Sequence, residues 1–196
     1  MRTFRLFSLA ALAIATLSAQ ATTGFGPGNG NGPGPRGPQQ NQPVVVLPAT
    51  AEEIASLTYM REEEKFARDV YRFLFEKWNY AEFDRIATAE QQHFANIGTL
   101  LTRYNIPDPA ATDTPGVFAN PKLTELYGQL TAKGANSLKD AIEVGVTIEK
   151  ADIDDLSAAI ETATKYDIKR VYTNLMQASF NHLDAFESAL ELLAAL

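Results

Sequence analysis

Two residues with metal-binding side chains, Glu90 and His93, stand three positions apart in the chain. Residues at this spacing lie on one face of a helix, about one turn from each other. They interrupt an apolar stripe of helical periodicity, which reads Phe83, Ile86, Glu90, His93, Ile97, Leu100 and Tyr104. Core positions rarely hold a carboxylate or an imidazole unless the group is paired or bound to something. The stretch therefore predicts a buried polar site.

Three other apolar stripes are interrupted in the same way near their midpoints. The interrupting residues are Glu64, Glu149, Asp152 and His182. Midpoints of long helices that pack side by side lie at one height, so four carboxylates and both histidines of the chain are expected to converge. Two divalent cations would balance four carboxylates in charge and remove most of the cost of burying them.

A weaker explanation of the same residues is a buried polar network without metal. A single Glu-x-x-His pattern is weak, because solvated helix faces show it by chance. The coincidence of four interrupted stripes favours a centre of two divalent metal ions.

Four long helices are expected to position these side chains, and no segment alternates with the period of two typical of strands. The fold class is therefore all-α, with long helices expected at residues 50–78, 82–105, 137–163 and 167–196.

Capping residues predict where several helices begin. Thr50 and Glu53 form a capping box, and Ser137 and Asp167 are N-cap candidates. Asn120 and Gly134 bound a short extra helix between the second and third long helices. A connection of about 30 residues can return the chain along a helix of about 37 Å. This long crossover predicts a ferritin-like four-helix bundle.

Some faces of these helices are assigned by pattern alone. Glu62 and Glu63 are expected at solvent or at the edge of the core. A second apolar stripe, Phe66, Val70 and Phe73, could cover the back of the domain or form a homodimer surface. In the last helix the inward residues are expected to be Ile168, Val171, Leu175, Ala178, His182, Ala185, Ala189 and Leu192.

The N-terminal part of the chain reads as an export signal followed by a linker. Residues 1–21 have a basic start, an apolar run too short to span a bilayer, and an Ala-x-Ala end, which together predict a cleaved signal peptide. Residues 22–47 hold most of the glycines and half of the prolines found in the chain, and are expected to be a disordered linker. Residues 48–196 then form the folded domain. The protein is expected to be exported, periplasmic or extracellular, with no membrane attachment after cleavage.

Charge and composition limit the partners. The formal net charge is -7, and it becomes -9 once Arg2 and Arg5 leave with the signal peptide. An acidic chain without a basic tract is not expected to bind nucleic acid. The chain has no cysteine, so carboxylate and imidazole ligands favour iron first, with manganese or zinc as alternatives.

The stretches Glu64-x-x-Ala67-Arg68-x-x-Tyr71 and Ala89-Glu90-x-x-His93 resemble the first two helices of rubrerythrin and other ferritin-like di-iron carboxylate proteins. Residues 61–71, 148–156 and 179–186 resemble more closely an uncharacterised bacterial and archaeal ferritin-like family. This resemblance covers about residues 47–190.

The resemblance implies a four-helix bundle with a dimetal centre and assigns a role to each ligand. Glu64 matches the carboxylate ligand of the first long helix, and Glu149 matches that of the third. Glu90 matches the bridging carboxylate, and His93 completes the ligands of its metal. His182 matches the imidazole ligand of the last helix. The second Glu-x-x-His motif is incomplete, because Ser179 stands where a glutamate is expected. Asp152 could replace that carboxylate.

Three functions are consistent with these residues. The first is an oxidoreductase whose dimetal centre reacts with oxygen or peroxide. The second is a non-catalytic periplasmic protein that binds or buffers metal ions, and the third is a helical module with a metal-free polar core.

Overall fold

The computed structural model describes residues 47–195, so the predicted signal peptide and nearly all of the predicted linker lie outside the described residues. The described part is all-helical and contains no strand, which confirms the predicted class. None of its helices is long and apolar enough to cross a membrane. The five helices are α1 (Ala51–Trp78), α2 (Ala81–Arg103), α3 (Pro121–Gly134), α4 (Leu138–Thr162) and α5 (Tyr166–Ala194).

Most helix starts follow the capping residues predicted from the sequence. Thr50 and Glu53 form the capping box of α1, which continues without a break to Trp78. Asn120 caps α3 and Ser137 caps α4 through side-chain acceptors. The prediction that Asp167 is an N-cap was wrong, because α5 begins at Tyr166 and its N-cap is Lys165. The Asp167 carboxylate instead accepts a hydrogen bond from Tyr104.

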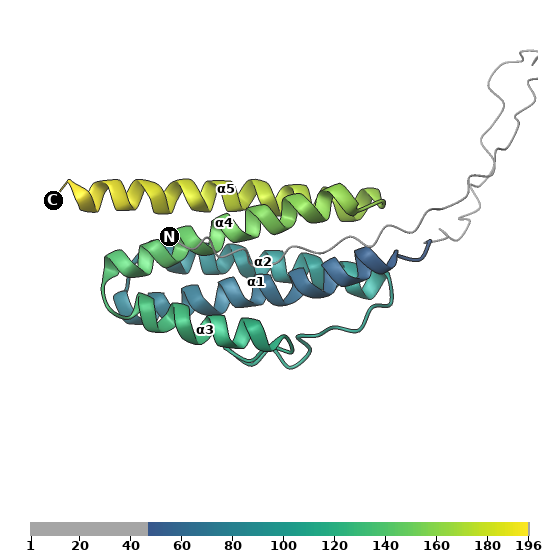
Figure 1. Cartoon of the computed structure of the whole chain (residues 1–196), viewed down its shortest axis with the longest axis horizontal. Helices are drawn as coiled ribbons and strands as arrows, with labels where there is room; N and C mark the ends of the chain where they lie inside the picture. Colours follow the sequence, from purple (N-terminus) through teal and green to yellow (C-terminus); the bar gives the residue numbers. More distant parts are fainter. Residues whose placement is uncertain (1–46, 196) are drawn as a thin grey trace, which may run out of the picture. The chain divides into compact units, whose positions relative to one another are not determined.

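The helices pack as two pairs that face each other (Figure 1). α1 packs along α2, and α4 along α5; in addition α1 contacts α4, and α2 contacts α5. Figure 1 shows α2 and α4 running in the same direction, so the chain must return along the helices between them. α3 lies in this return and packs on α1 and α4.

The apolar core is divided in two. One cluster includes Leu74, Phe83 and Phe186, and the other includes Leu57, Ile97 and Tyr172. Along α1 and α2, the positions between these clusters are those of Glu64, Glu90 and His93. Polar side chains therefore occupy the middle of the helices, and apolar side chains stabilise the packing on both sides of them.

The middle of α1 has no exposed face, since every residue from Met60 to Tyr71 is buried. The predicted second apolar stripe lies within this part: Phe66 and Val70 are buried, and Phe66 packs edge-on against Phe118. The alternative interpretation of Phe66 and Val70 as an exposed homodimer surface is therefore wrong. Phe73 is only partly buried.

The expected exposure of Glu62 and Glu63 was also wrong, because both are 4% exposed. Glu62 accepts hydrogen bonds from the backbone N–H groups of Ala119 and Asn120 at the start of α3. A carboxylate at a helix N-terminus is favourable, since it satisfies free N–H groups and opposes the helix dipole.

Buried basic residues of α1 hold the segment that precedes α3. Arg61 pairs with Asp108 at 2.8 Å, and the Lys65 ammonium donates to the Thr114 carbonyl at 2.7 Å. Arg68 donates to Asp113 and pairs with Asp69 at 2.8 Å. Each buried cation thus has a charged or carbonyl partner, which offsets the loss of its hydration.

The inward face of α5 differs from the prediction by one residue at every second position of the stripe. Tyr172, Ser179 and Phe186 are buried, whereas the predicted Leu192 is 71% exposed. Ile168, Leu175, His182 and Ala189 are buried as expected. Ser179 therefore faces the polar middle of the bundle.

Candidate metal centre

Glu90 of α2 lies at the centre of the buried polar group and is 2% exposed. Its Oε2 atom is 2.7 Å from Nδ1 of His93, and its Oε1 atom is 2.9 Å from Nδ1 of His182 on α5. The two imidazole rings are nearly parallel, with centroids 5.9 Å apart. One carboxylate thus joins both histidines, using a different oxygen for each.

Each histidine also approaches a second carboxylate. His93 Nδ1 is 3.2 Å from Oε2 of Glu64 on α1, and His182 Nδ1 is 3.5 Å from Oε2 of Glu149 on α4. All four long helices therefore contribute a side chain, as the four interrupted stripes predicted.

These residues form two groups of three that share Glu90. One group is Glu64, Glu90 and His93; the other is Glu90, Glu149 and His182. In each, one ligand atom per residue lies within 4.8 Å of the others, close enough for all three to contact one ion. The shared carboxylate could bridge two ions.

Asp152 lies beside the two groups but belongs to neither. It is 5% exposed, and its Oδ2 atom accepts a 2.5 Å hydrogen bond from Ser179. Its Oδ1 atom is buried without a hydrogen-bond partner. Ser179 therefore holds the carboxylate that could replace the missing glutamate, and leaves one of its oxygens available.

Tyr71 fixes the orientation of another ligand candidate. Its hydroxyl donates to Oε1 of Glu149 at 2.6 Å, and the ring is fully buried between Phe83 and Phe186. Because Tyr71 occupies Oε1, the other oxygen of Glu149 faces His182.

Burial and mutual repulsion disfavour the charged form of three carboxylates. Burial raises the pKa of Glu64 well above its usual range, and the charge of Asp152 adds to this effect. Burial and the charge of Glu90 raise the pKa of Glu149 to about 7 and that of Asp152 to about 8. Without a cation, these groups hold protons at a pH where exposed carboxyls are ionised.

Glu90 and the imidazoles behave in the opposite way. Burial alone would raise the pKa of Glu90, but His182 and His93 lower it to about 2. Burial would lower both histidine pKa values, yet Glu64 and Glu90 raise that of His93 to about 11, and Glu149 and Glu90 raise that of His182 to about 9. Protons on the imidazoles thus provide the positive charge that a metal could supply.

Unpartnered atoms among these residues also indicate that the group suits divalent cations. Glu64 Oε1, Asp152 Oδ1 and His182 Nδ1 are buried without a hydrogen-bond partner, although His182 Nδ1 lies at ion-pair distance from Glu90. Unpartnered buried polar atoms are costly and uncommon in folded proteins. Cations bound at the two groups would satisfy Glu64 and His182, and Asp152 lies beside them.

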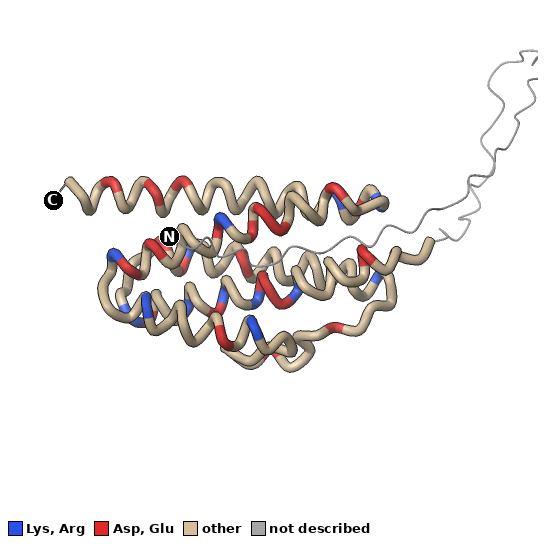
Figure 2. The backbone as a smooth tube through the Cα atoms, in the orientation of Figure 1, with Lys and Arg blue, Asp and Glu red and all other residues tan. Residues whose placement is uncertain are grey.

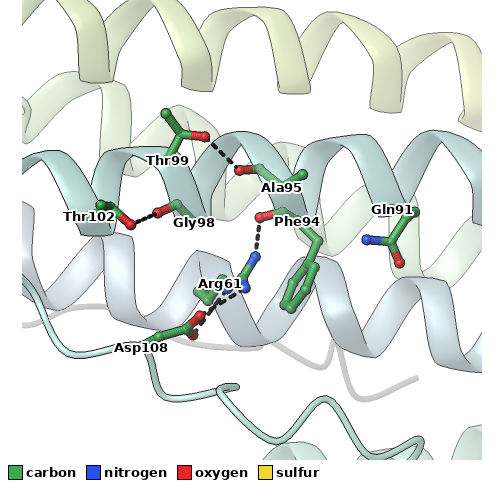
Figure 3. Close-up of a pocket in the computed structure, with 8 residues that line it drawn as sticks. All are labelled: Arg61, Gln91, Phe94, Ala95, Gly98, Thr99, Thr102 and Asp108. Atoms are coloured by element: carbon green, nitrogen blue, oxygen red, sulfur yellow. Dashed lines mark hydrogen bonds and ion pairs between the residues drawn. The ribbon is translucent and has the colours of Figure 1, made fainter.

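A surface pocket of about 340 Å³ lies elsewhere (Figure 3), and none of the six predicted ligands lines it. It is bounded by α2 and by Arg61 and Asp108, whose ion pair is drawn there. The Arg61 guanidinium also stacks 3.1 Å from the Phe94 ring centroid. These groups already satisfy one another, and the pocket lies apart from the candidate centre.

The structure brings together five of the six residues selected from the sequence and places the sixth, Asp152, beside them. Sequence reasoning missed Ser179 as a hydrogen-bond donor, and Glu63 as a buried neighbour of Asp152. The second apolar stripe of α1 was the available signal for Glu63, because apolar residues on two sides indicate a helix buried on two sides.

Comparison with known proteins places the chain among helical proteins of undescribed activity. Residues 53–195 match the family described as "Uncharacterized protein domain (DUF2202)". Uncharacterized protein MJ0754 of Methanocaldococcus jannaschii is 51% identical over 139 residues, which are 71% of this chain and 75% of the archaeal one.

Two solved structures are also similar. The crystal structure of hypothetical protein MJ0754 from Methanococcus jannaschii has a TM-score of 0.75 and 47% identity, covering 78% of this chain and 87% of that one. A DUF305 fragment from Deinococcus radiodurans has a TM-score of 0.55 and 12% identity, covering 74% and 99%, and shows a likeness of fold alone. These matches support membership of an uncharacterised family that has an archaeal relative, whereas the link to ferritin and rubrerythrin remains a prediction.

Proposed function

The chain belongs to the DUF2202 family, and we propose that it is an exported ferritin-like protein that binds two divalent metal ions for oxidoreductase chemistry with oxygen or peroxide. The packing of α1 with α2 and of α4 with α5, joined by a long connection that carries α3, supports the ferritin-like bundle.

One observation carries the proposal: two ligand groups from four helices share the carboxylate of Glu90. In the proposed centre Glu64, Glu90 and His93 would hold one ion, and Glu90, Glu149 and His182 would hold the other. The carboxylate of Glu90 would serve both groups.

Iron is the first choice of metal, with manganese or zinc as alternatives, since the ligands are carboxylates and imidazoles and the chain has no cysteine. When bound, a pair of iron ions supplies the electrons for reduction of oxygen or peroxide. Tyr71 holds Glu149 through its 2.6 Å hydrogen bond, and Ser179 holds Asp152 through a 2.5 Å bond. These contacts orient the carboxylates before an ion arrives.

The imidazole rings form the least buried edge of the centre. Their side chains retain 9% and 10% exposure, whereas Glu64 retains 1%. A small oxidant could approach along this edge, while the two apolar clusters exclude bulk water from both ends of the site.

A non-catalytic role in metal binding or buffering is the second candidate. Ser179 replaces the expected glutamate, so the Glu149 and His182 ion has fewer carboxylate ligands than the resemblance implies. An ion held by fewer protein ligands is released more readily, which suits a buffer.

Metal analysis of the protein purified from its native compartment tests the proposal. Wild type should hold two equivalents, and Glu90→Ala and His182→Ala should each lose at least one. Asp154→Ala is the matched control, because this exposed carboxylate lies on α4 outside both groups. A wild type without bound metal after exposure to Fe²⁺, Mn²⁺ and Zn²⁺ would leave the metal-free polar core as the function of these residues.

Turnover separates the two candidate functions. The iron-loaded protein should consume peroxide in the presence of a reductant, and Glu90→Ala should abolish this activity. Stable binding of two ions without turnover indicates the buffering role. Export is tested on the same sample, whose N-terminus should be Thr22 by mass spectrometry.

A further inference from the structure

Glu63 is a buried carboxylate that belongs to neither ligand group. It is 4% exposed, and its Oε2 atom is buried without a hydrogen-bond partner. The other buried acids of α1 outside the centre have donors. Glu62 accepts backbone N–H groups, and Asp69 pairs with Lys65 and Arg68. The charges that act most strongly on Glu63 are instead those of carboxylates.

Asp155 of α4 lies directly against Glu63. The Tyr59 hydroxyl is 3.3 Å from Oε1 of Glu63 and 3.2 Å from Oδ2 of Asp155, and the two carboxyls are close enough to hydrogen-bond to each other. Three oxygen-bearing side chains thus meet where α1 faces α4. Two like charges in contact favour either a shared proton or a cation between them.

These carboxylates form a graded path from the surface to the candidate centre. Asp155 is half-buried, and Glu63 and Asp152 are buried. Both Asp152 and Glu64 exert electrostatic repulsion on Glu63. Figure 2 shows the acidic positions gathered at the middle of α1 and of α4. The path ends at Asp152 Oδ1 and Glu64 Oε1, which are also buried and unpartnered.

We propose that Glu63 and Asp155 form a third, oxygen-only cation site through which divalent ions pass to Asp152 and then to the paired centre. This inference rests on the proposed function of that centre. Two carboxylates and one hydroxyl supply few of the six ligands that Mn²⁺ or Mg²⁺ requires, so an ion there keeps part of its water shell. Such an ion is held weakly and moves on when imidazole and further carboxylates replace its waters.

The rate of metal uptake tests the third site. Metal-free wild type, Glu63→Gln, Asp155→Asn and Asp154→Asn are mixed with Mn²⁺, and the loss of the free-ion EPR signal is followed in time. Glu63→Gln and Asp155→Asn should load at least tenfold more slowly than wild type and reach the same final number of bound ions. Asp154→Asn is the matched control and should load at the wild-type rate, since its carboxylate lies outside the buried path.

Different results would contradict the third site and the paired centre. Loading of Glu63→Gln and Asp155→Asn at the wild-type rate contradicts the third site alone, and indicates uptake past His93 and His182 at the least buried edge of the centre. A wild type that takes up no Mn²⁺ contradicts the paired centre and the transfer together. Glu63→Gln is expected to fold, because glutamine has the shape of a protonated glutamate. If this variant unfolds, Asp155→Asn still decides the outcome, because Asp155 is only partly buried.

Discussion

At the scale of single residues, the four acids of the centre differ in how their charges are compensated. Glu90 lies between two imidazoles, at 2.7 and 2.9 Å. Glu64 approaches one imidazole, and it is repelled by Asp152 and Glu90. Removing the charge of Glu90 relieves repulsion but also removes two favourable contacts, whereas removing the charge of Glu64 relieves repulsion and removes only one.

This difference predicts opposite costs for two isosteric substitutions. In metal-free protein, Glu90→Gln should lower the free energy of unfolding by about 2 kcal/mol, because each buried imidazole loses the nearer of its two carboxylates. Glu64→Gln should change it by less than about 0.5 kcal/mol, because the group it replaces already favours the protonated form. Urea unfolding at pH 7 measures both. Equal costs would indicate a uniform hydrogen-bond network in place of a cluster of unequal charges.

At the scale of helices, close approach of α4 to α5 depends on Gly145. A Cβ atom at this position would lie 2.6 Å from the ring of Phe186, which is fully buried. The ring also packs against Tyr71, with centroids 5.5 Å apart, and Tyr71 holds Glu149. A change at Gly145 is therefore transmitted to a ligand candidate.

Gly145→Ala should destabilise the protein by about 1–3 kcal/mol, since the ring has no free space to move into. The matched control is Gly128→Ala on the exposed face of α3, where nothing lies within 4 Å of the added atom. This control should stabilise the protein by about 0.5–1 kcal/mol through helix propensity. Thermal unfolding measures the melting temperature of both variants. A similar change in both would show that the Phe186 ring can move aside at little cost.

Glu53 joins the start of α1 to the connection between α4 and α5. Its Oε2 atom accepts the Thr50 N–H, and its Oε1 atom accepts the N–H groups of Thr164 and Lys165 at 2.6 and 2.9 Å. Burial alone would raise the pKa of Glu53, but these backbone donors lower it to about 2.

The lowered pKa predicts how stability depends on pH. Glu53 is more acidic in the folded chain than in the unfolded one, so its contribution is complete above about pH 4.5 and is lost as the pH falls towards 2. Glu53→Gln should therefore cost about 2 kcal/mol at pH 7 and much less near pH 2. Denaturant unfolding of wild type and variant across this range measures the difference. Glu52→Gln, at an exposed neighbour, is the matched control and should leave the free energy of unfolding at pH 7 nearly unchanged.

At the scale of the whole molecule, the polar centre divides the core and links all four long helices. Only the folded chain brings these side chains together, so metal ions should bind the folded state and not the unfolded one. Metal binding should therefore stabilise the fold. The protein without metal must instead bury repelling carboxylates with protons in place of cations.

Removal of metal should therefore lower the melting temperature. An ion present at one hundred times its dissociation constant contributes about 2.7 kcal/mol, and the loss should be reversed by adding the metal back. Glu90→Ala should show little further change on treatment with a chelator, whereas Asp154→Ala should respond like wild type. A chelator that leaves the melting temperature of wild type unchanged contradicts coupling between the centre and the fold.

The sequence alone indicated the helices and the residues of the buried polar group, because these depend on local regularities. The capping box at Thr50 and the cap at Ser137 act within one turn, and the spacing of Glu90 and His93 places them on one face whatever surrounds it. On α5, every second predicted core position was displaced by one residue. Small residues such as Ala178 and Ala185 flank both possible stripes, so periodicity alone could not separate them.

Only the tertiary structure decided which charged residues of α1 are buried. The connection after α2 folds back over this helix through Asp108, Asp113 and Asn120, and so covers a face that local patterns assign to solvent. The same packing brings Glu63 against Asp155, which is 92 positions later in the chain. Contacts between distant segments are selected by the burial of the whole chain, and no spacing within a single helix encodes them.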